Sequence, residues 1–159
     1  MFDQFPLSSS RLALGTAQFG QEYGLFSKSS PSRNEIMKIL QLAKENSVQL
    51  LDTAPSYNCS EEILGSSGII EDFKIVTKFS KANYKLNSIE NKQKIIDKFR
   101  ESIDLLKVDK IYGILIHQAE DLDIDNGRFI RDLVNDFRKD GRVSKIGISV
   151  YSANQIERV

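Results

Sequence analysis

Two hydrophobic periodicities alternate along this chain. Short apolar runs typical of buried strands cover residues 11–16, 48–53, 73–78, 111–117 and 144–149. Segments with helical spacing lie between these runs, for example at 32–46 and 89–106 and along the stripe of Phe129, Ile130, Leu133, Val134 and Phe137. Strands that are separated by helices pair in parallel through right-handed crossovers, so the predicted fold class is α/β.

Local signals mark where several of these helices begin and end. Ser32 and Glu35 form a capping box, which predicts a helix start at that point. A short helix is expected over Ser60–Gly65, with the glycine stopping it, and Gly141 is expected to end the helix before the fifth strand. A further helix begins near Ala153. The acidic run 120–125 is expected to be a solvated loop.

The length of the chain limits which parallel architecture it can complete. Its 159 residues predict a single domain spanning 1–159. A complete (β/α)8 barrel needs roughly 250 residues. If the chain belongs to a barrel, it is expected to form about five of the eight β-α units, which is an incomplete TIM-type barrel. Periodicity alone leaves an open doubly wound sheet as the alternative.

The composition and charge of the chain argue against several classes of function. Lys+Arg and Asp+Glu both number 22, so no net field favours nucleic acid or an anionic membrane. No apolar run approaches a membrane span, and the start of the chain lacks a signal pattern, so a cytoplasmic protein is expected. The chain has one histidine and one cysteine, Cys59, which gives no basis for expecting a metal site.

Ionisable side chains lie at or just after three successive predicted strands. Asp52 closes the second strand, Tyr57 lies in the loop that follows it, Lys78 closes the third strand and His117 closes the fourth. Taken singly, each has an ordinary structural explanation, such as a turn cap, a loop aromatic or a solvated strand end. Together they are expected to converge, because the carboxyl ends of parallel strands face one crevice in both architectures.

These four residue types suit proton transfer to an oxygen. A tyrosine hydroxyl, whose reference pKa is about 10, is a useful acid near neutrality only where its phenolate is stabilised. The ammonium of Lys78 would supply that charge, and Asp52 would hold the lysine and offset the cost of burying it. His117 would orient a carbonyl oxygen or assist the transfer. The residues offer no hydride, so a cofactor must supply one.

The sequence around these positions resembles the aldo-keto reductase family. The resemblance rests on residues 14–17 (Leu-Gly-Thr-Ala), 51–57 (Leu-Asp-Thr-Ala-Pro-Ser-Tyr), 60–65 (Ser-Glu-Glu-Ile-Leu-Gly), 76–78, 115–117 and 142–149. It extends over about residues 11–152. Residues 15–20 and 149–151 are similar to a bacterial branch often associated with surface-sugar biosynthesis.

The resemblance implies a (β/α)8 barrel that binds NADPH or NADH and reduces an aldehyde or ketone, or runs the reverse reaction. The implied catalytic set is Asp52, Tyr57, Lys78 and His117, with Tyr57 as general acid. Cofactor contacts would come from Ser149, which touches the nicotinamide carboxamide, and from Thr16 and Ala17 beneath it. Two positions depart from the common pattern, since Asn58 replaces a frequent glycine and Val150 a frequent asparagine.

The main cofactor-phosphate contacts of the family lie beyond the fifth strand. The isolated chain is therefore expected to bind NADPH poorly and to turn over slowly. The expected partner is a small carbonyl or alcohol substrate, with self-association or a completing chain as a further possibility. The alternative function is a binding or regulatory subunit derived from a reductase. The intact set Asp52, Tyr57, Lys78 and His117 favours catalysis over that alternative.

Overall fold

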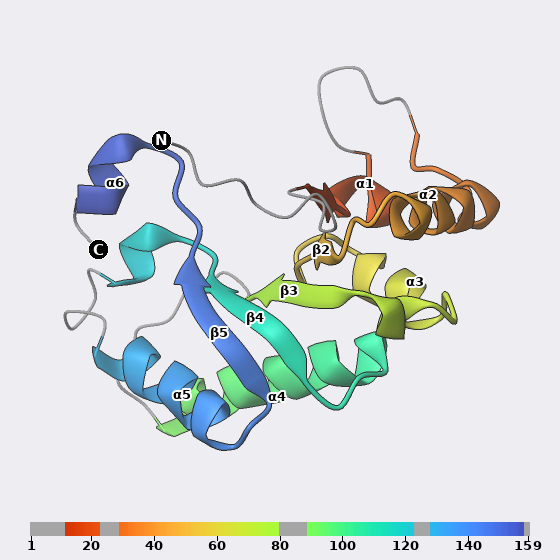
Figure 1. Cartoon of the computed structure of the whole chain (residues 1–159). Coiled ribbons are helices and arrows are strands. Elements are labelled where there is room, and N and C mark those ends of the chain that lie inside the picture. Colours follow the sequence, from red (N-terminus) through yellow and green to blue (C-terminus); the bar gives the residue numbers. More distant parts are fainter. Residues whose placement is uncertain (1–11, 23–28, 80–88, 123–127, 158–159) are drawn as a thin grey trace.

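One parallel sheet forms the centre of the molecule (Figure 1). The computed structural model describes residues 12–22, 29–79, 89–122 and 128–157. The strands are β1 (Ala13–Gly15), β2 (Leu50–Asp52), β3 (Lys74–Lys78), β4 (Ile111–Ile116) and β5 (Val143–Ile148). Every strand pairs in parallel with the next one along the chain, in the order β1-β2-β3-β4-β5.

This strand order decides between the two architectures that the sequence left open. A doubly wound sheet reverses its strand order at a switch point, whereas strands in a barrel wall follow one another around the ring. The observed order is the second kind, so the prediction of a partial barrel is confirmed. β1 and β5 are the two edges of the five-stranded sheet.

Helices follow the strands in alternation, as predicted. They are α1 (Ala17–Gly20), α2 (Arg33–Glu45), α3 (Ser60–Gly65), α4 (Ile89–Leu106), α5 (Arg128–Lys139) and α6 (Ala153–Glu157), with 3-10 turns η1 (Ile70–Asp72) and η2 (Ala119–Leu122). The periodicity did not predict α1, η1 or η2, which are too short to show a repeat. In Figure 1, α4 and α5 lie together on one side of β3, β4 and β5.

The helix signals at α2 and α5 act as predicted. Ser32 caps α2, its hydroxyl accepting from the Glu35 amide at 3.3 Å while the Glu35 carboxylate accepts from the Ser32 amide at 2.8 Å. Gly141 follows α5 with a φ of 72°, a left-handed conformation that glycine adopts without a steric penalty.

The predicted helix over Ser60–Gly65 is confirmed, and Gly65 is where it ends. Gly65 is the last residue of α3 and its φ is not positive, so it does not stop the helix as a left-handed cap. A Cβ at this position would collide with the carbonyl oxygen of Leu105 and would lie 2.7 Å from the carbonyl carbon of Leu106. The glycine therefore lets α3 approach the backbone at the end of α4.

The described part of the acidic run, residues 120–122, is not the solvated loop that was expected. Residues 119–122 form η2, and Asp121 within it is only 7% exposed. Burial raises the pKa of Asp121, and the negative charge of Glu120 raises it further. Asp123 and Asp125 lie outside the described residues.

The two faces of the sheet differ in burial. Leu51, Ile75 and Ile114 are buried on the face that the helices cover, and they belong to the main hydrophobic core. Burying each such side chain stabilises the fold by about 1.5–3 kcal/mol. On the opposite face, Lys74 and Lys145 are exposed and Leu115 is half-buried. Within the described residues, nothing corresponds to the remaining wall of a barrel that would cover this face.

Candidate active site

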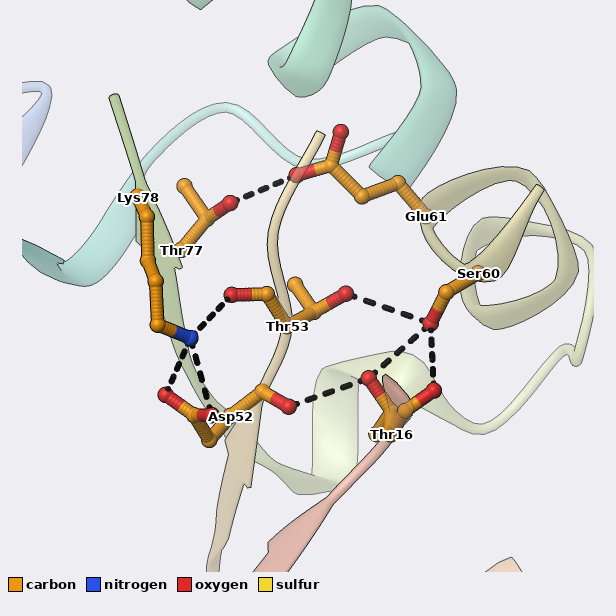
Figure 2. Close-up of polar contacts among 7 residues, drawn as sticks. All are labelled: Thr16, Asp52, Thr53, Ser60, Glu61, Thr77 and Lys78. Carbon is orange, nitrogen blue, oxygen red and sulfur yellow. Dashed lines mark hydrogen bonds and ion pairs between the residues drawn. The ribbon is translucent and has the colours of Figure 1, made fainter. Parts of the chain in front are cut away.

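Asp52 and Lys78 meet at the carboxyl ends of β2 and β3. The Lys78 Nζ donates to Asp52 Oδ1 at 2.8 Å, to Asp52 Oδ2 at 2.9 Å and to the Thr53 carbonyl at 2.9 Å (Figure 2). Lys78 is 7% exposed and the Asp52 side chain 34% exposed. The ammonium is thus almost buried, and both carboxylate oxygens together with a backbone oxygen compensate its charge.

Tyr57 lies against the same ammonium. The Lys78 Nζ is 4.8 Å from the centroid of the Tyr57 ring, within the range of a cation–π contact. The turn that carries the tyrosine is fixed by its own backbone, since the Tyr57 amide donates to Ala54 at 3.0 Å and the Ser60 amide donates to Tyr57 at 3.1 Å. The predicted convergence of Asp52, Tyr57 and Lys78 is therefore observed.

Asn58, one of the departures from the common pattern, has a structural explanation. Its φ is 52°, in the left-handed region where glycine is most at ease and asparagine is the best tolerated of the other residues. The turn after Tyr57 thus keeps the backbone conformation that a glycine would give.

His117 and Ser149 follow neighbouring strands. His117 comes directly after β4 and is 8% exposed, and Ser149 comes directly after β5 and is half-buried. The Ser149 amide donates to the Ile116 carbonyl at 2.8 Å, which holds Ser149 beside the strand end that carries His117. Both residues therefore lie at the same end of the sheet as Lys78, because all five strands are parallel.

Thr16 and Ala17 follow β1 at that end too. Thr16 is fully buried, and its hydroxyl donates to the Asp52 carbonyl at 3.0 Å, while Ala17 is half-buried as the first residue of α1. The Thr16 hydroxyl is thus engaged within the protein. Contact of Thr16 and Ala17 with a cofactor stays a prediction.

Ser60 ties the first two strand ends to α3. Its hydroxyl lies 2.9 Å from Thr16 Oγ1, 3.0 Å from the Thr16 carbonyl and 3.2 Å from Thr53 Oγ1 (Figure 2). The sequence interpretation used Ser60 only as part of a motif. Its position as the first residue of a predicted helix, three residues after Tyr57, was the available signal.

Gly20 supports the Tyr57 turn from the other side. A Cβ on Gly20 would collide with the Tyr57 carbonyl oxygen and would lie 2.6 Å from the Ser60 amide nitrogen. This glycine therefore lets the end of α1 pack directly against the backbone that presents the tyrosine. No local pattern in the sequence reveals this contact, because residues 20 and 57 are far apart in the chain.

Comparison with known proteins shows the family of this chain. The family model described as the aldo/keto reductase family matches residues 11–159. The chain belongs to the aldo/keto reductase family. This family consists of oxidoreductases. The five-stranded sheet of the chain corresponds to part of the aldo-keto reductase barrel.

Individual aldo-keto reductases align with almost the whole chain. A chloroplastic pyridoxal reductase of Arabidopsis thaliana is 26% identical over 175 residues, which include 97% of this chain and 45% of the relative. A Pseudomonas aeruginosa structure described as an aldo-keto reductase is 28% identical with a TM-score of 0.72, covering 92% of this chain and 60% of that one. The chain thus spans roughly half the length of these relatives.

A third relative carries a bound cofactor. The structure of a Bombyx mori aldo-keto reductase in complex with NADP has a TM-score of 0.64 and 24% identity, and the match covers 92% of this chain and 48% of that one. At this identity the likeness concerns the fold alone.

Among the described residues, no helix is long and apolar enough to cross a membrane.

Proposed function

We propose that this chain is the N-terminal part of an NAD(P)H-dependent oxidoreductase that reduces an aldehyde or ketone, or oxidises the corresponding alcohol. The observation that carries the proposal is the position of Lys78 Nζ, which both Asp52 carboxylate oxygens hold while it lies 4.8 Å from the centroid of the Tyr57 ring. A buried ammonium fixed beside a phenol stabilises the phenolate that forms when the phenol gives up its proton.

Each residue then has a defined part in the reaction. Tyr57 donates its hydroxyl proton to the carbonyl oxygen as negative charge develops there. Lys78 stabilises the phenolate that remains, and Asp52 holds the lysine in place. His117, at the end of β4, orients the carbonyl oxygen toward Tyr57. A reduced nicotinamide cofactor, when bound, supplies the hydride that none of these side chains provides.

The cofactor contacts assigned to this chain are Ser149, Thr16 and Ala17. The half-buried position of Ser149 at the end of β5, beside the strand that carries His117, supports its proposed contact with the nicotinamide carboxamide. Thr16 and Ala17 offer a small, mostly buried surface at the end of β1. NADPH, or alternatively NADH, is the proposed cofactor, and the proposed partner is a small carbonyl or alcohol substrate in the cytoplasm.

Substitution of the proposed acid tests this function. In a form of the protein that reduces a test aldehyde such as pyridoxal, Tyr57→Phe should lower kcat by about 10²–10⁴-fold, because the ring stays but the proton donor is lost. Tyr112→Phe is the matched control, since Tyr112 lies near the start of β4 and its ring contact with Lys74 does not need the hydroxyl. Equal turnover in the parent and Tyr57→Phe would rule out the acid role and favour a binding or regulatory subunit.

A further inference from the structure

Glu61 is a buried acid that the proposed reaction does not use. It is 1% exposed, and its two carboxyl oxygens contact two different elements. Oε1 accepts from the Thr77 hydroxyl of β3 at 2.6 Å, and Oε2 accepts from the Ser102 hydroxyl of α4 at 3.0 Å. One side chain of α3 therefore joins a strand and a second helix.

The contact with Thr77 connects the two segments that bear the proposed acid and its ammonium. Glu61 is the second residue of α3. The turn of Tyr57 leads directly into that helix, and the Ser60 amide donates a hydrogen bond to the Tyr57 carbonyl. Thr77 immediately precedes Lys78 on β3. Figure 2 shows the Glu61–Thr77 contact next to the bonds of Lys78 with Asp52 and Thr53.

Burying this carboxyl group is unfavourable. Desolvation raises the pKa of Glu61, and the hydroxyls of Thr77 and Ser102 offset only part of that effect. An apolar side chain of similar volume would avoid the cost of desolvating the carboxyl group, but it would leave the buried Thr77 and Ser102 hydroxyls without that acceptor. Desolvation therefore opposes an acid at this position, and its directional contact with the strand of Lys78 gives a specific reason for one.

We propose that Glu61 is a positioning residue, whose contact with Thr77 sets the spacing between the Tyr57 ring and the Lys78 ammonium. The inference rests on the proposed function, in which that spacing determines how well the phenolate is stabilised. The hydrogen bond between the Ser102 hydroxyl and Glu61 Oε2 connects the carboxyl group to α4. It is not part of the connection between Glu61 and the strand of Lys78.

The Lys78 εCH2 resonance, observed by NMR of the chain with ¹³C-labelled lysine, reports this spacing directly. Protons above an aromatic face are shifted by its ring current, and the Lys78 Nζ lies 4.8 Å from the Tyr57 centroid. Lys78→Met assigns the signal, and Tyr57→Leu gives its position without the ring current. Thr77→Val removes the hydroxyl while keeping the shape, and is expected to move the resonance most of the way toward the Tyr57→Leu position.

Two matched variants separate positioning from general stability. Thr77→Ser keeps the hydroxyl and is expected to leave the resonance at its parent position. Ser102→Ala also removes one bond to Glu61, but on the side of α4, and is likewise expected to leave it there. Glu61→Met fills the same space without the carboxyl and repeats the test if Thr77→Val does not fold.

The possible outcomes distinguish the inference from the proposed function. A resonance that stays at the parent position in Thr77→Val and Glu61→Met, or that moves equally in Ser102→Ala, would overturn the positioning role alone. If Tyr57→Leu itself leaves the Lys78 resonance unchanged, the ring does not lie over the amine, and both the inference and the site geometry behind the proposed function are wrong.

Discussion

At the scale of single residues, the site is organised around charges that are only partly accessible to water. Lys78 is nearly buried, and its ammonium donates to Asp52 and to the Thr53 carbonyl. Glu61, on the other side of the β3 backbone, is an acid in a dry environment with two hydroxyl donors. Lys78 is paired directly with a carboxylate, whereas the hydrogen-bond partners of the Glu61 carboxyl group are two neutral hydroxyls.

Glu61 should make the stability of the fold depend on pH. Burial raises its pKa above the ordinary value of 4.5, with Glu101 raising it further and Lys78 opposing. A raised folded-state pKa contributes stability that is fully present below the unfolded pKa and is lost as pH rises through the folded pKa. Glu61→Gln cannot ionise, so the difference in unfolding free energy between variant and parent should shift in favour of the variant as pH rises.

Urea unfolding of the parent and Glu61→Gln at a series of pH values measures this difference. Glu35→Gln is a suitable control, because Glu35 is exposed and its pKa is lowered by bonds to Ser32, so its effect should have the opposite sign. A Glu61→Gln difference that stays constant with pH would contradict a raised pKa at this position.

At the scale of elements, close backbone approaches fix how the helices meet. Gly65 brings α3 against the end of α4, and Gly20 brings α1 against the Tyr57 turn. Both contacts involve backbone atoms on the other side, which cannot rotate away as a flexible side chain would. The two glycines thus hold α3 between α1 and α4, and α3 in turn carries Ser60 and Glu61.

Gly65→Ala should therefore destabilise the fold, by about 1–3 kcal/mol, because the added methyl group must push α3 away from Leu105 and Leu106. The matched control is Gly15→Ala, since a Cβ on Gly15 would meet no atom within 4 Å. Chemical denaturation of the two variants compares them. Equal stability of Gly65→Ala and the parent would show that the two helices separate at little cost.

At the scale of the whole molecule, the sheet is one section of a barrel wall. Five strands follow one another in order, Leu51, Ile75 and Ile114 are buried on their helix-covered face, and the opposite face carries the exposed side chains of Lys74 and Lys145. In barrels of this class the phosphate group of a ligand commonly binds near the loops after strands seven and eight. The described residues supply the proposed proton-transfer site but not those loops.

The 159-residue chain by itself is accordingly expected to bind NADPH weakly. Fluorescence titration of the purified chain with NADPH is the direct measurement, and no saturation is expected at micromolar concentrations. The same titration with a form that contains the remaining strands provides the control, and it should saturate. Saturable micromolar binding by the 159-residue chain would mean that its own residues hold the cofactor without those loops.

The sequence alone determined the alternation of strands and helices, and with it the strand ends where Asp52, Lys78 and His117 lie. It could do so because hydrophobic periodicity and capping are local and are written in neighbouring residues. The motifs at residues 14–17, 51–57 and 60–65 also resemble the family that the comparisons show.

The tertiary structure alone decided the rest. Periodicity is the same in a barrel wall and a doubly wound sheet, so only the pairing order separated them. The structural roles of Gly20, Gly65 and Glu61 were also found only in the fold, because each depends on a contact with a residue distant in the chain. Such contacts follow from how elements pack against one another, and no short stretch of sequence encodes that packing.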